Sequence, residues 1–485
     1  MTAVAQRPDS PVAPPPPAPR GRAHTAYRTY VPAWWRDLVG VLTWASMLVV
    51  LALWVGGGNL RDLTGWGTGL TAVGRLTGLV ASDLLLIQVL LMARIPLVER
   101  TYGQDELARR HRLVGFWSFN LMWAHVVVVT LGYAVQAHIN VFAETWDLVV
   151  DYRGILLAVA GALLLVLVTV SSIRKARRRL RYESWHLLHL YAYLGVGLAL
   201  PHQLWAGQEF MSSTVASIYW WTLWGAAAGA VLVWRLGVPL YRTLTHQLRV
   251  VDVVRESHEA ISVVMTGWHL DWLPVAAGQF FVWRFLDGPG WTRGHPYSLS
   301  AAPTGSTLRI TVKDLPGSAV GPGDPSRGLA TIRPGTRVAI EGPYGRLHDD
   351  VRTRRKVLLL AGGIGVTPLR GLLEALPQQA GDVTMVYRSS HEDDLILKPE
   401  IEALAAERGA RVFYAVGPRV ADRHSWLPEA AASLSDEDAL RQLVPDIADH
   451  DVYLCGADGW MDAAERAVLA AGVPRDAVHL ERFSW

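Results

Sequence analysis

Residues 111–125 read HRLVGFWSFNLMWAH, inside an apolar run long enough to cross a bilayer. His111 and His125 stand 14 residues apart, which on an ideal helix leaves their rings about 40° apart in direction and about 21 Å apart along the axis. A later apolar run carries His189 and His202, 13 residues or roughly 20 Å apart. Because ligating residues are costly inside a membrane, these four histidines indicate a functional site.

Two helices that each carry two histidines at matched depths predict two stacked b-type haems, since imidazole nitrogen is a common iron ligand. Thirteen residues rotate an ideal helix by about 220°, which turns His202 away from the face of His189, and a kink at Pro201 can re-aim it. His186, one turn before His189, is an alternative inner ligand. Arg75 is a candidate for binding a haem propionate.

The composition separates an apolar half from a polar half. Of the 485 residues, 51% are hydrophobic and 18% charged, and the apolar residues crowd the first half. The single cysteine, Cys455, excludes an internal disulfide, thiolate-ligated iron–sulfur clusters and four-cysteine zinc sites. The net charge is only +3, and the basic residues cluster between apolar runs, so they indicate membrane topology and no nucleic-acid partner.

Six segments are long and apolar enough to span a bilayer in contact with membrane lipid. They are expected at Leu38–Val55, Leu76–Ala93, Leu113–Val135, Ile155–Ile173, Trp185–Leu204 and Val215–Leu236. Basic residues precede the first segment and fill two alternate connections, which the positive-inside rule places in the cytosol. The sequence therefore predicts a multi-pass protein of the cell (plasma) membrane with both termini cytoplasmic. We expect a disordered proline-rich tail over residues 1–30 and the membrane domain over residues 31–243.

The remaining sequence is typical of soluble domains. Short β-rich runs separated by turn residues predict an antiparallel β-barrel over residues 244–350. These runs are Leu248–Val254, Ala260–Thr266, Gln279–Arg284, Thr307–Val312 and Arg337–Glu341. Apolar strands that alternate with helical stretches then predict a parallel α/β domain over residues 351–485. Its strands are expected at Val357–Leu360, Val383–Tyr387, Val412–Ala415 and Val452–Leu454.

A flavin site is expected in the first of these two domains. The segment His295-Pro296-Tyr297-Ser298 places an aromatic ring beside a hydroxyl group, which suits packing on an isoalloxazine ring and hydrogen bonding to its polar edge. Gly323 and Ser326 are candidates for contacting the FAD pyrophosphate through backbone amides and a hydroxyl donor. Gly317 and Ser318 are an alternative for the same place.

A nicotinamide nucleotide site is expected in the second domain. The segment VLLLAGGIGVTP, residues 357–368, is a strand, a glycine loop and a helix start, which together suit a phosphate group. Its candidate binding residues are Gly362, Gly363, Gly365, Thr367 and Pro368. Arg388 is a candidate for the ribose 2′-phosphate, which favours NADPH over NADH. Cys455 and Gly456 are candidates beside the nicotinamide, and Phe483 or Trp485 can cover the flavin face.

Taken together, these motifs resemble the ferric reductase and NADPH oxidase superfamily over nearly the whole chain after residue 30. The likeness rests on the paired histidines and on the runs Tyr182–Trp185, His295–Ser298, Gly362–Pro368 and Glu481–Phe483. It implies that His111 and His189 bind the inner haem and that His125 and His202 bind the outer one. It also implies that Tyr297 and Ser298 bind FAD, that the glycine loop and Arg388 bind NADPH, and that Phe483 packs on the flavin.

The expected function is transmembrane electron transfer from cytosolic NADPH, or alternatively NADH, through FAD and two haems to a small-molecule acceptor outside. The superoxide-forming oxidases of the animal type carry a further histidine four residues after the outer ligand, where this chain has Val129. Ferric chelates and dioxygen therefore both stay open as acceptors. The alternative functions are a membrane haem subunit that exchanges electrons with quinone or a partner reductase, and a transporter with a regulatory domain.

Overall fold

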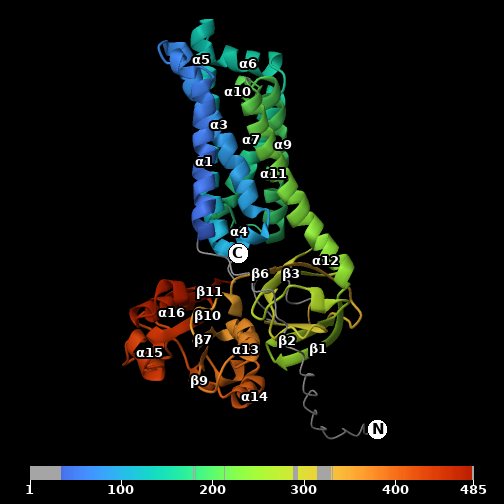
Figure 1. The fold of residues 1–485 in the computed structure, drawn as a ribbon, viewed down its shortest axis with the longest axis vertical. Helices are drawn as coiled ribbons and strands as arrows, with labels where there is room; N and C mark the ends of the chain where they lie inside the picture. Colours follow the sequence, from blue (N-terminus) through green and yellow to red (C-terminus); the bar gives the residue numbers. More distant parts are fainter. Residues whose placement is uncertain are drawn as a thin grey trace, which may run out of the picture.

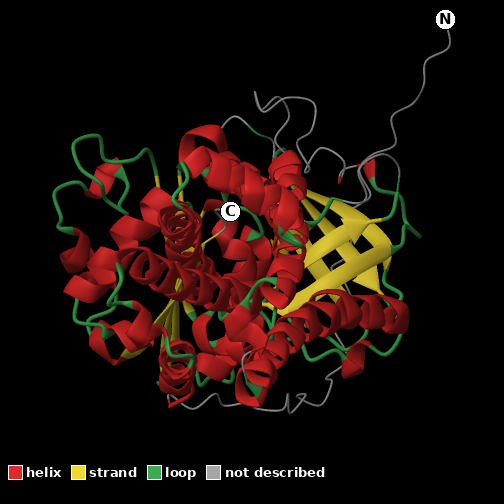
Figure 2. Cartoon of the chain, turned by 90° about the horizontal axis from the view of Figure 1, so that it is seen from above, coloured by secondary structure: helices red, strands yellow, loops and turns green. Residues whose placement is uncertain are grey.

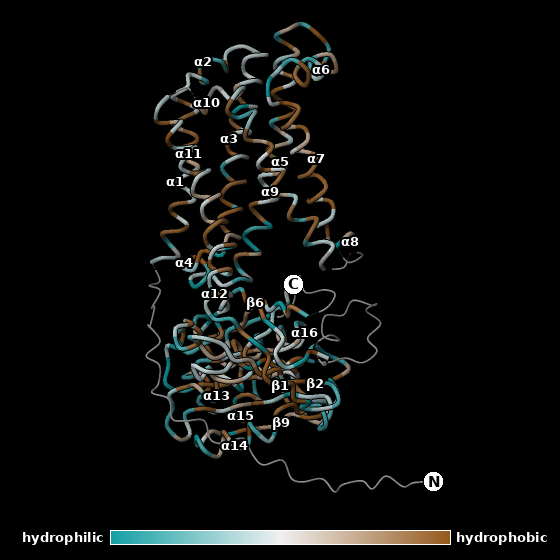
Figure 3. Tube along the Cα trace, turned by 90° about the vertical axis from the view of Figure 1, so that its right-hand side faces the viewer, coloured by the Kyte–Doolittle hydropathy of each residue, from teal (hydrophilic) through white to brown (hydrophobic). Residues whose placement is uncertain are grey.

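The computed structural model describes residues 34–177, 182–211, 213–287, 293–313 and 331–482, together with residues 180 and 329. A bundle of long helices forms one end of the molecule, and a β-rich part and an α/β part lie side by side at the other (Figure 1). Hydropathy follows the same division, because the bundle is largely hydrophobic and the other two parts are mixed (Figure 3). The predicted multidomain architecture is confirmed at this level.

The helical bundle consists of long helices joined by short ones. The long helices are α1 (Trp34–Gly56), α3 (Trp66–Met92), α5 (Gln104–Ala137), α7 (Ile155–Ser172), α9 (Tyr182–Trp205) and α11 (Thr214–Ala230). The short helices are α2 (Asn59–Asp62), α4 (Pro96–Tyr102), α6 (Val141–Asp151), α8 (Arg174–Arg177) and α10 (Gln208–Met211). Among the described residues, five helices are long and apolar enough to cross a membrane, and α9 is not one of them. The expected span at Trp185–Leu204 is thus a helix, and its crossing stays a prediction.

Small residues let the helices approach each other closely. The helix α3 packs along α5, and α7 packs along α9. A Cβ atom on Gly161 of α7 would lie 2.6 Å from the carbonyl oxygen of Gly195 on α9. A Cβ atom on Gly74 of α3 would lie 2.4 Å from a methyl group of Val129 on α5. Such close packing of backbones is a main source of helix association in lipid.

The last helix of the bundle continues into the β-rich part. The π-helical segment η1 (Val231–Gly237) follows α11 without a break and leads into α12 (Val238–His246). Pro239 has no N–H group, so it cannot continue the α-helical hydrogen-bond ladder. The N–H of Val238 donates to the carbonyl of Val233, five residues back, as in a π-helix. The three segments form one rod from the bundle to the strands (Figure 1).

The β-rich part contains two antiparallel sheets and no closed barrel among the described residues, which corrects the predicted barrel. One sheet has the order β1-β2-β5, and the other has the order β4-β3-β6. The strands are β1 (Arg249–Ser257), β2 (Ala260–Thr266), β3 (Phe280–Phe285), β4 (His295–Ser298), β5 (Thr307–Lys313) and β6 (Val338–Tyr344). Within the described residues, the two sheets are connected by isolated bridges, Leu299 to Ile310 and Arg249 to Arg337. The predicted runs match β1, β2, β3, β5 and β6, whereas β4 was not predicted as a strand. Closure of a barrel depends on pairing between strands, which period-2 patterns do not encode.

The α/β part is a five-stranded parallel sheet with the order β11-β10-β7-β8-β9. Its strands are β7 (Lys356–Gly362), β8 (Val383–Ser389), β9 (Arg411–Val416), β10 (His450–Gly456) and β11 (Val478–Arg482). Its helices are α13 (Val366–Ala375), α14 (Lys398–Arg408), α15 (Asp436–Leu443) and α16 (Asp458–Ala470). Alternate residues of β7 belong to two separate hydrophobic clusters, one on each face of the sheet. The edge strand β11 was not predicted.

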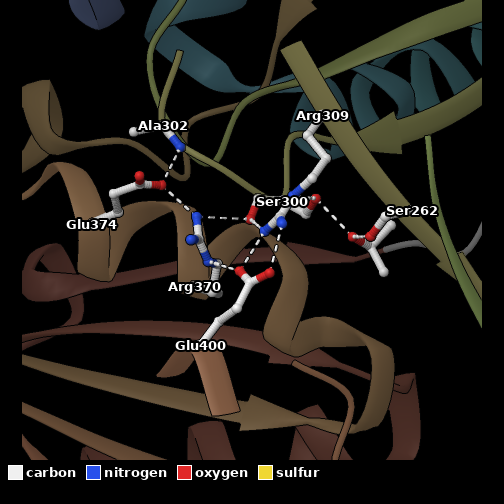
Figure 4. A network of polar contacts seen from close by, with 8 residues as sticks. Ser262, Ser300, Ala302, Arg309, Arg370, Glu374 and Glu400 are labelled. Carbon is white, nitrogen blue, oxygen red and sulfur yellow. Dashed lines mark hydrogen bonds and ion pairs between the residues drawn. The ribbon is translucent and has the colours of Figure 1, made fainter. Parts of the chain in front are cut away.

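A polar network joins the β-rich part to the α/β part (Figure 4). Arg309 on β5 donates two hydrogen bonds to the carboxylate of Glu400 on α14, both at 2.8 Å. Arg370 on α13 lies 2.9 Å from the same carboxylate and donates to the carbonyl of Ser300. Viewed from above, the strands of the two parts lie on opposite sides of the molecule (Figure 2). The network thus holds the β-rich part and the α/β part in one relative orientation.

Candidate functional site

The inner pair of histidines faces one another across the bundle. The ring centres of His111 on α5 and His189 on α9 lie 6.0 Å apart. Two imidazoles that ligate one metal ion from opposite sides, with bonds of about 2 Å, place their ring centres about 6 Å apart. Nδ1 of His111 lies 3.3 Å from the carbonyl oxygen of Gln88, and Nδ1 of His189 lies 3.3 Å from Oγ of Ser172. Partners at Nδ1 leave Nε2 free, as in metal-ligating histidines.

The outer pair lies farther along the same two helices. Nδ1 of His125 donates a 2.8 Å hydrogen bond to the carbonyl of Gly74 on α3. A Cβ atom on Gly78 would lie 2.5 Å from this ring, so a glycine is required for the ring to lie there. His202 lies close enough to His125 for their charges to interact, and Pro201 lies within the same helix. Nδ1 of His202 is buried without a hydrogen bond of ordinary geometry to the described residues.

Two further candidates lie beside these pairs. His186 is half-buried one turn before His189 on α9, and the ring that lies against His111 is that of His189. Arg75 is partly buried on α3, directly after Gly74, whose carbonyl accepts the hydrogen bond of His125. The inner pair therefore has the spacing of a bis-histidine metal centre, and a second pair of histidines lies farther along the same two helices, with Arg75 beside it.

The candidate flavin residues line β4. Ser298 is buried, and its Oγ atom has no hydrogen-bond partner among the described residues, so it can take a ligand. Tyr297 is half-buried, and its carbonyl accepts a 2.9 Å hydrogen bond from Trp283 Nε1. His295 stacks on Tyr297 with ring centres 5.9 Å apart, and Pro296 lies between them in the strand. Gly323 and Ser326, like the alternative pair Gly317 and Ser318, lie outside the described residues.

The candidate nucleotide residues meet at the carboxyl edge of the parallel sheet. In the strand register, Gly362 of β7 lies beside Arg388 of β8, and Ala361 lies beside Cys455 of β10. Cys455 in turn lies beside Glu481 of β11. In open α/β sheets, ligands bind outside this edge, so the sequence motifs from three separate strands converge on one place.

Three glycines at this edge, Gly362, Gly365 and Gly456, are packed too tightly for a side chain. A Cβ atom on Gly365 would lie 2.2 Å from the carbonyl oxygen of Cys455, and one on Gly362 or Gly456 would lie 2.7 Å from the ring of Trp460. The backbone of Gly363 is left-handed, with φ of +56°. Pro368 and Thr367 start α13, and the Thr367 hydroxyl donates to the carbonyl of Ile364 at 2.9 Å. The loop therefore exposes backbone at a helix start, where phosphate binds.

Arg388 differs from its expected role. Its guanidinium group is buried and donates to the carbonyls of Ser389, Ala415 and Pro418. Burial, together with the charge of Arg419, lowers the pKa of Arg388. The exposed Arg419 follows Pro418 directly, so Arg388 shapes the loop that carries a second guanidinium group. The sequence analysis did not single out Arg419, because one arginine after a strand end carries no distinctive spacing.

The buried Cys455 lies against the carbonyl of Glu481, with Sγ at 3.7 Å from the oxygen. Burial, reinforced by the charge of Glu481, raises the pKa of the Cys455 thiol, so the thiol stays protonated and is no nucleophile. A Cβ atom on Gly345, in the turn after β6, would lie 2.5 Å from the Glu481 carboxylate. Glu481 therefore links the nucleotide edge to the β-rich part, a contact that its place in a terminal motif did not reveal. Phe483 and Trp485 lie outside the described residues.

Two known protein families match this chain, one in the helical bundle and one in the α/β part. The family model of the ferric reductase like transmembrane component matches residues 77–200, which include His111, His125 and His189. The family model of the oxidoreductase NAD-binding domain matches residues 359–466, which include the glycine loop and Cys455. The chain belongs to the ferric reductase and NADPH oxidase-like superfamily.

Several reductases are similar in sequence to the part of the chain that follows the helical bundle. Ferredoxin–NADP reductase B of Sorangium cellulosum is 33% identical over 216 residues, covering 43% of this chain and 84% of the relative. The ferredoxin reductase component of 3-ketosteroid-9-alpha-monooxygenase of Mycolicibacterium smegmatis is 31% identical over 246 residues. That match covers 49% of this chain, which spans 65% of the length of that relative.

Among solved structures, the FAD/NAD binding domain of nitric oxide dioxygenase from Vibrio cholerae is similar at 27% identity and a TM-score of 0.41. The alignment covers 49% of this chain and 99% of that one. The two family models together place a ferric reductase like transmembrane component before an oxidoreductase NAD-binding domain in this chain.

Proposed function

We propose that the protein carries electrons from cytosolic NADPH, through FAD and two b-type haems, to an acceptor outside the cell membrane. The observation that carries this proposal is the inner histidine pair, whose ring centres lie 6.0 Å apart on two separate helices. The Nδ1 partners of His111 and His189 favour Nε2 as the free ligand atom on each ring.

The four histidines would hold the haems, with His111 and His189 at the inner one and His125 and His202 at the outer one. Arg75 is proposed to bind a propionate of the outer haem. A bound FAD would supply the conversion of a two-electron hydride donor into the single electrons that haem iron requires.

The remaining candidate residues are proposed to bind and orient the flavin and the nicotinamide nucleotide. Ser298 Oγ donates to the polar edge of the flavin, and Tyr297 packs against its ring. The loop Gly362–Gly365 presents backbone amides to the nucleotide phosphates at the start of α13. Cys455 fills the space beside the nicotinamide as a neutral thiol. Gly323, Ser326 and Phe483 keep their sequence-based roles as proposals, the first two at the pyrophosphate and the last on the flavin.

The orientation and the domain limits follow the charge pattern. Because the positive-inside rule predicts the basic connections to be cytosolic, we propose that the two reductase parts are cytosolic as well. We propose a membrane domain at residues 31–243, an FAD domain at 244–350 and an NADPH domain at 351–485. Ferric chelates and dioxygen are both proposed as acceptors, and the apolar Val129 packed on Gly74 provides no polar group near the outer pair.

The test is an anaerobic visible spectrum of the purified full chain after addition of NADPH. We expect reduced b-type haem bands that are lost in His111→Ala and His189→Ala. Addition of a ferric chelate or of oxygen then ranks the acceptors by the rate of reoxidation. Haem that stays oxidised with NADPH but is reduced by dithionite would favour the membrane haem subunit served by a partner reductase. A protein that binds no haem would refute the proposed function.

A further inference from the structure

One arginine with a buried side chain, Arg94, lies where the helical bundle meets the β-rich part. Arg94 follows the end of α3, and its φ of +65° is in the left-handed region, which costs free energy for a residue with a side chain. Its side chain is only 8% exposed although it carries a positive charge. Such a residue persists only where its surroundings compensate both costs.

The partners of Arg94 come from both sides of the junction. On the bundle side, its Nη1 atom donates to Oε1 of Gln104 at 2.6 Å and lies 3.4 Å from Oε1 of Glu99. On the side of β6, its Nε atom lies 3.8 Å from Oε1 of Glu341, and its guanidinium carbon lies 4.0 Å from the centre of the Tyr344 ring. One cation therefore contacts two carboxylates and an aromatic face across the boundary.

The carboxylate of Glu341 is ionised at neutral pH. Burial alone raises the pKa of Glu341, but the charges of Arg94, Arg235 and Arg284 outweigh it and lower the pKa below its ordinary value. Arg284 lies 3.5 Å from this carboxylate, on the neighbouring strand β3. The attraction between Arg94 and Glu341 is therefore between full charges in a place that excludes water.

Both sides of this contact lie next to the proposed redox sites. In the sheet β4-β3-β6, Val282 of β3 pairs with Glu341, and its neighbour Phe281 pairs with Tyr297. Glu341 is therefore one strand away from the candidate flavin residues. On the bundle side, the charges of Arg235 and Glu341 both act on His186, one turn from His189. The junction lies between the two sites that must exchange an electron.

We propose that Arg94 is the positioning residue for electron passage from the flavin part into the membrane part, acting through Glu341 and Tyr344. This proposal rests on the proposed function. The charge of Arg235 also acts on Glu341 across the junction. Other contacts there are hydrogen bonds to backbone carbonyls, from Thr243 Oγ1 to Ile340, from Arg242 to Gly342 and from Arg346 to Thr101. Such bonds permit small sliding motions, whereas a buried charge pair with a stacked ring fixes orientation.

The experiment is anaerobic stopped-flow spectroscopy on the full-length protein with NADPH, following flavin bleaching and haem reduction separately. In Arg94→Gln we expect unchanged flavin and haem content and an unchanged rate of flavin bleaching. We expect the rate of haem reduction to fall by at least about tenfold, since a misplacement of about 1 Å can cost that much. Arg94→Lys keeps the charge but not the planar guanidinium group, so its rate of haem reduction should lie between those of the unaltered protein and Arg94→Gln.

The matched control is Arg109→Gln, which removes a charge from the same stretch of chain. Arg109 is 73% exposed and pairs with Glu106 of its own helix, so haem reduction should keep its normal rate. Glu341→Gln should slow haem reduction as Arg94→Gln does, and the double variant should be no slower than the slower single one. Glu341→Gln also provides the test if Arg94→Gln does not fold.

Three results would overturn the proposal. They are normal haem reduction in both single variants, equal slowing of flavin bleaching and haem reduction, and additive slowing in the double variant. If NADPH fails to reduce haem even in the unaltered protein, the proposed function fails as well, and that outcome is visible before any variant is made.

Discussion

The guanidinium group of Arg388 already has three backbone carbonyls as partners, so little of its hydrogen-bonding capacity remains for a nucleotide. One of these carbonyls belongs to Pro418, at 3.1 Å from Nη2, and the next residue is the exposed Arg419. A phosphate group carries two charges near neutral pH and is bound best by an accessible guanidinium group. At the scale of the residue, we therefore propose that the exposed Arg419 makes the 2′-phosphate contact expected of Arg388, a role that stays a prediction for both.

Arg419→Gln should raise KM for NADPH about tenfold and leave KM for NADH nearly unchanged, because only NADPH carries the phosphate that loses a charged hydrogen bond. The measurement is steady-state reduction of ferricyanide with each nucleotide. Arg423→Gln, four residues along the same loop, is the matched control and should change neither constant. Equal changes in both KM values would show that Arg419 shapes the loop without reading the phosphate.

The residues that could be predicted are those whose chemistry depends on spacing within one segment. The histidines of α5 repeat at 14 residues, and the glycine loop is continuous in the chain, so both could be read from the sequence. Arg94, Glu341 and Glu481 could not, because their partners come from distant segments. A buried charge is recognised only when its neighbours are known.

At the scale of the element, α4 shows how a short helix can place a charge in the interior. Glu99 is in the middle of this seven-residue helix, and its carboxylate is 8% exposed between Arg94 and the strand β6. Burial raises the pKa of Glu99 to about 7, with the charge of Arg94 acting against it and that of Glu341 in favour. Glu99 is therefore half protonated near neutral pH, whereas the same carboxyl in an unfolded chain is ionised.

This shift determines how stability depends on pH. Between pH 4.5 and about 7 the folded protein binds more protons at Glu99 than the unfolded chain does, so stability decreases as the pH rises through this range. Glu99→Gln carries no titrating proton there. We expect it to match the unaltered protein near pH 5 and to be more stable above pH 7, by on the order of 3 kcal/mol.

The measurement for Glu99→Gln is the thermal midpoint in detergent by tryptophan fluorescence, from pH 5 to pH 8. Glu392→Gln removes an exposed carboxylate that pairs with Lys398 at 2.6 Å, and as the control it should keep the normal pH profile. If Glu99→Gln loses stability at every pH by the same amount, the carboxyl group acts as a hydrogen-bond acceptor and not as a titrating group.

At the scale of the whole molecule, the sequence predicted the order of the parts but not how they are held together. Periodicity and hydropathy are properties of single segments, so they located the bundle, the β-rich part and the α/β part. Contacts between parts depend on the register of unrelated strands and helices. The barrel was overpredicted for this reason, and the junction at Arg94 and the network at Arg309 were not foreseen.

The network at Arg309 acts on the other boundary, between the β-rich part and the α/β part (Figure 4). Burial alone raises the pKa of Glu400, but the hydrogen bond and charge of Arg309 and the charge of Arg370 outweigh it and lower the pKa below its ordinary value. Arg309→Gln removes both 2.8 Å hydrogen bonds and leaves Glu400 with Arg370 as its remaining short-range cation among the described residues. We expect a loss of stability of about 1–3 kcal/mol, because a charged group loses its bidentate partner.

Arg309→Gln should slow flavin bleaching, whereas Arg94→Gln should slow the later step of haem reduction. The α/β part would no longer be held in one orientation to the flavin residues, so flavin bleaching by NADPH should slow by about tenfold. Haem reduction should then follow bleaching without a further delay, since the junction at Arg94 is intact. Lys313→Gln is the control, because Lys313 is on the same strand but pairs with Glu259 inside the β-rich part, at 2.7 Å. Normal bleaching in Arg309→Gln would show that the remaining contacts suffice to orient the nucleotide site.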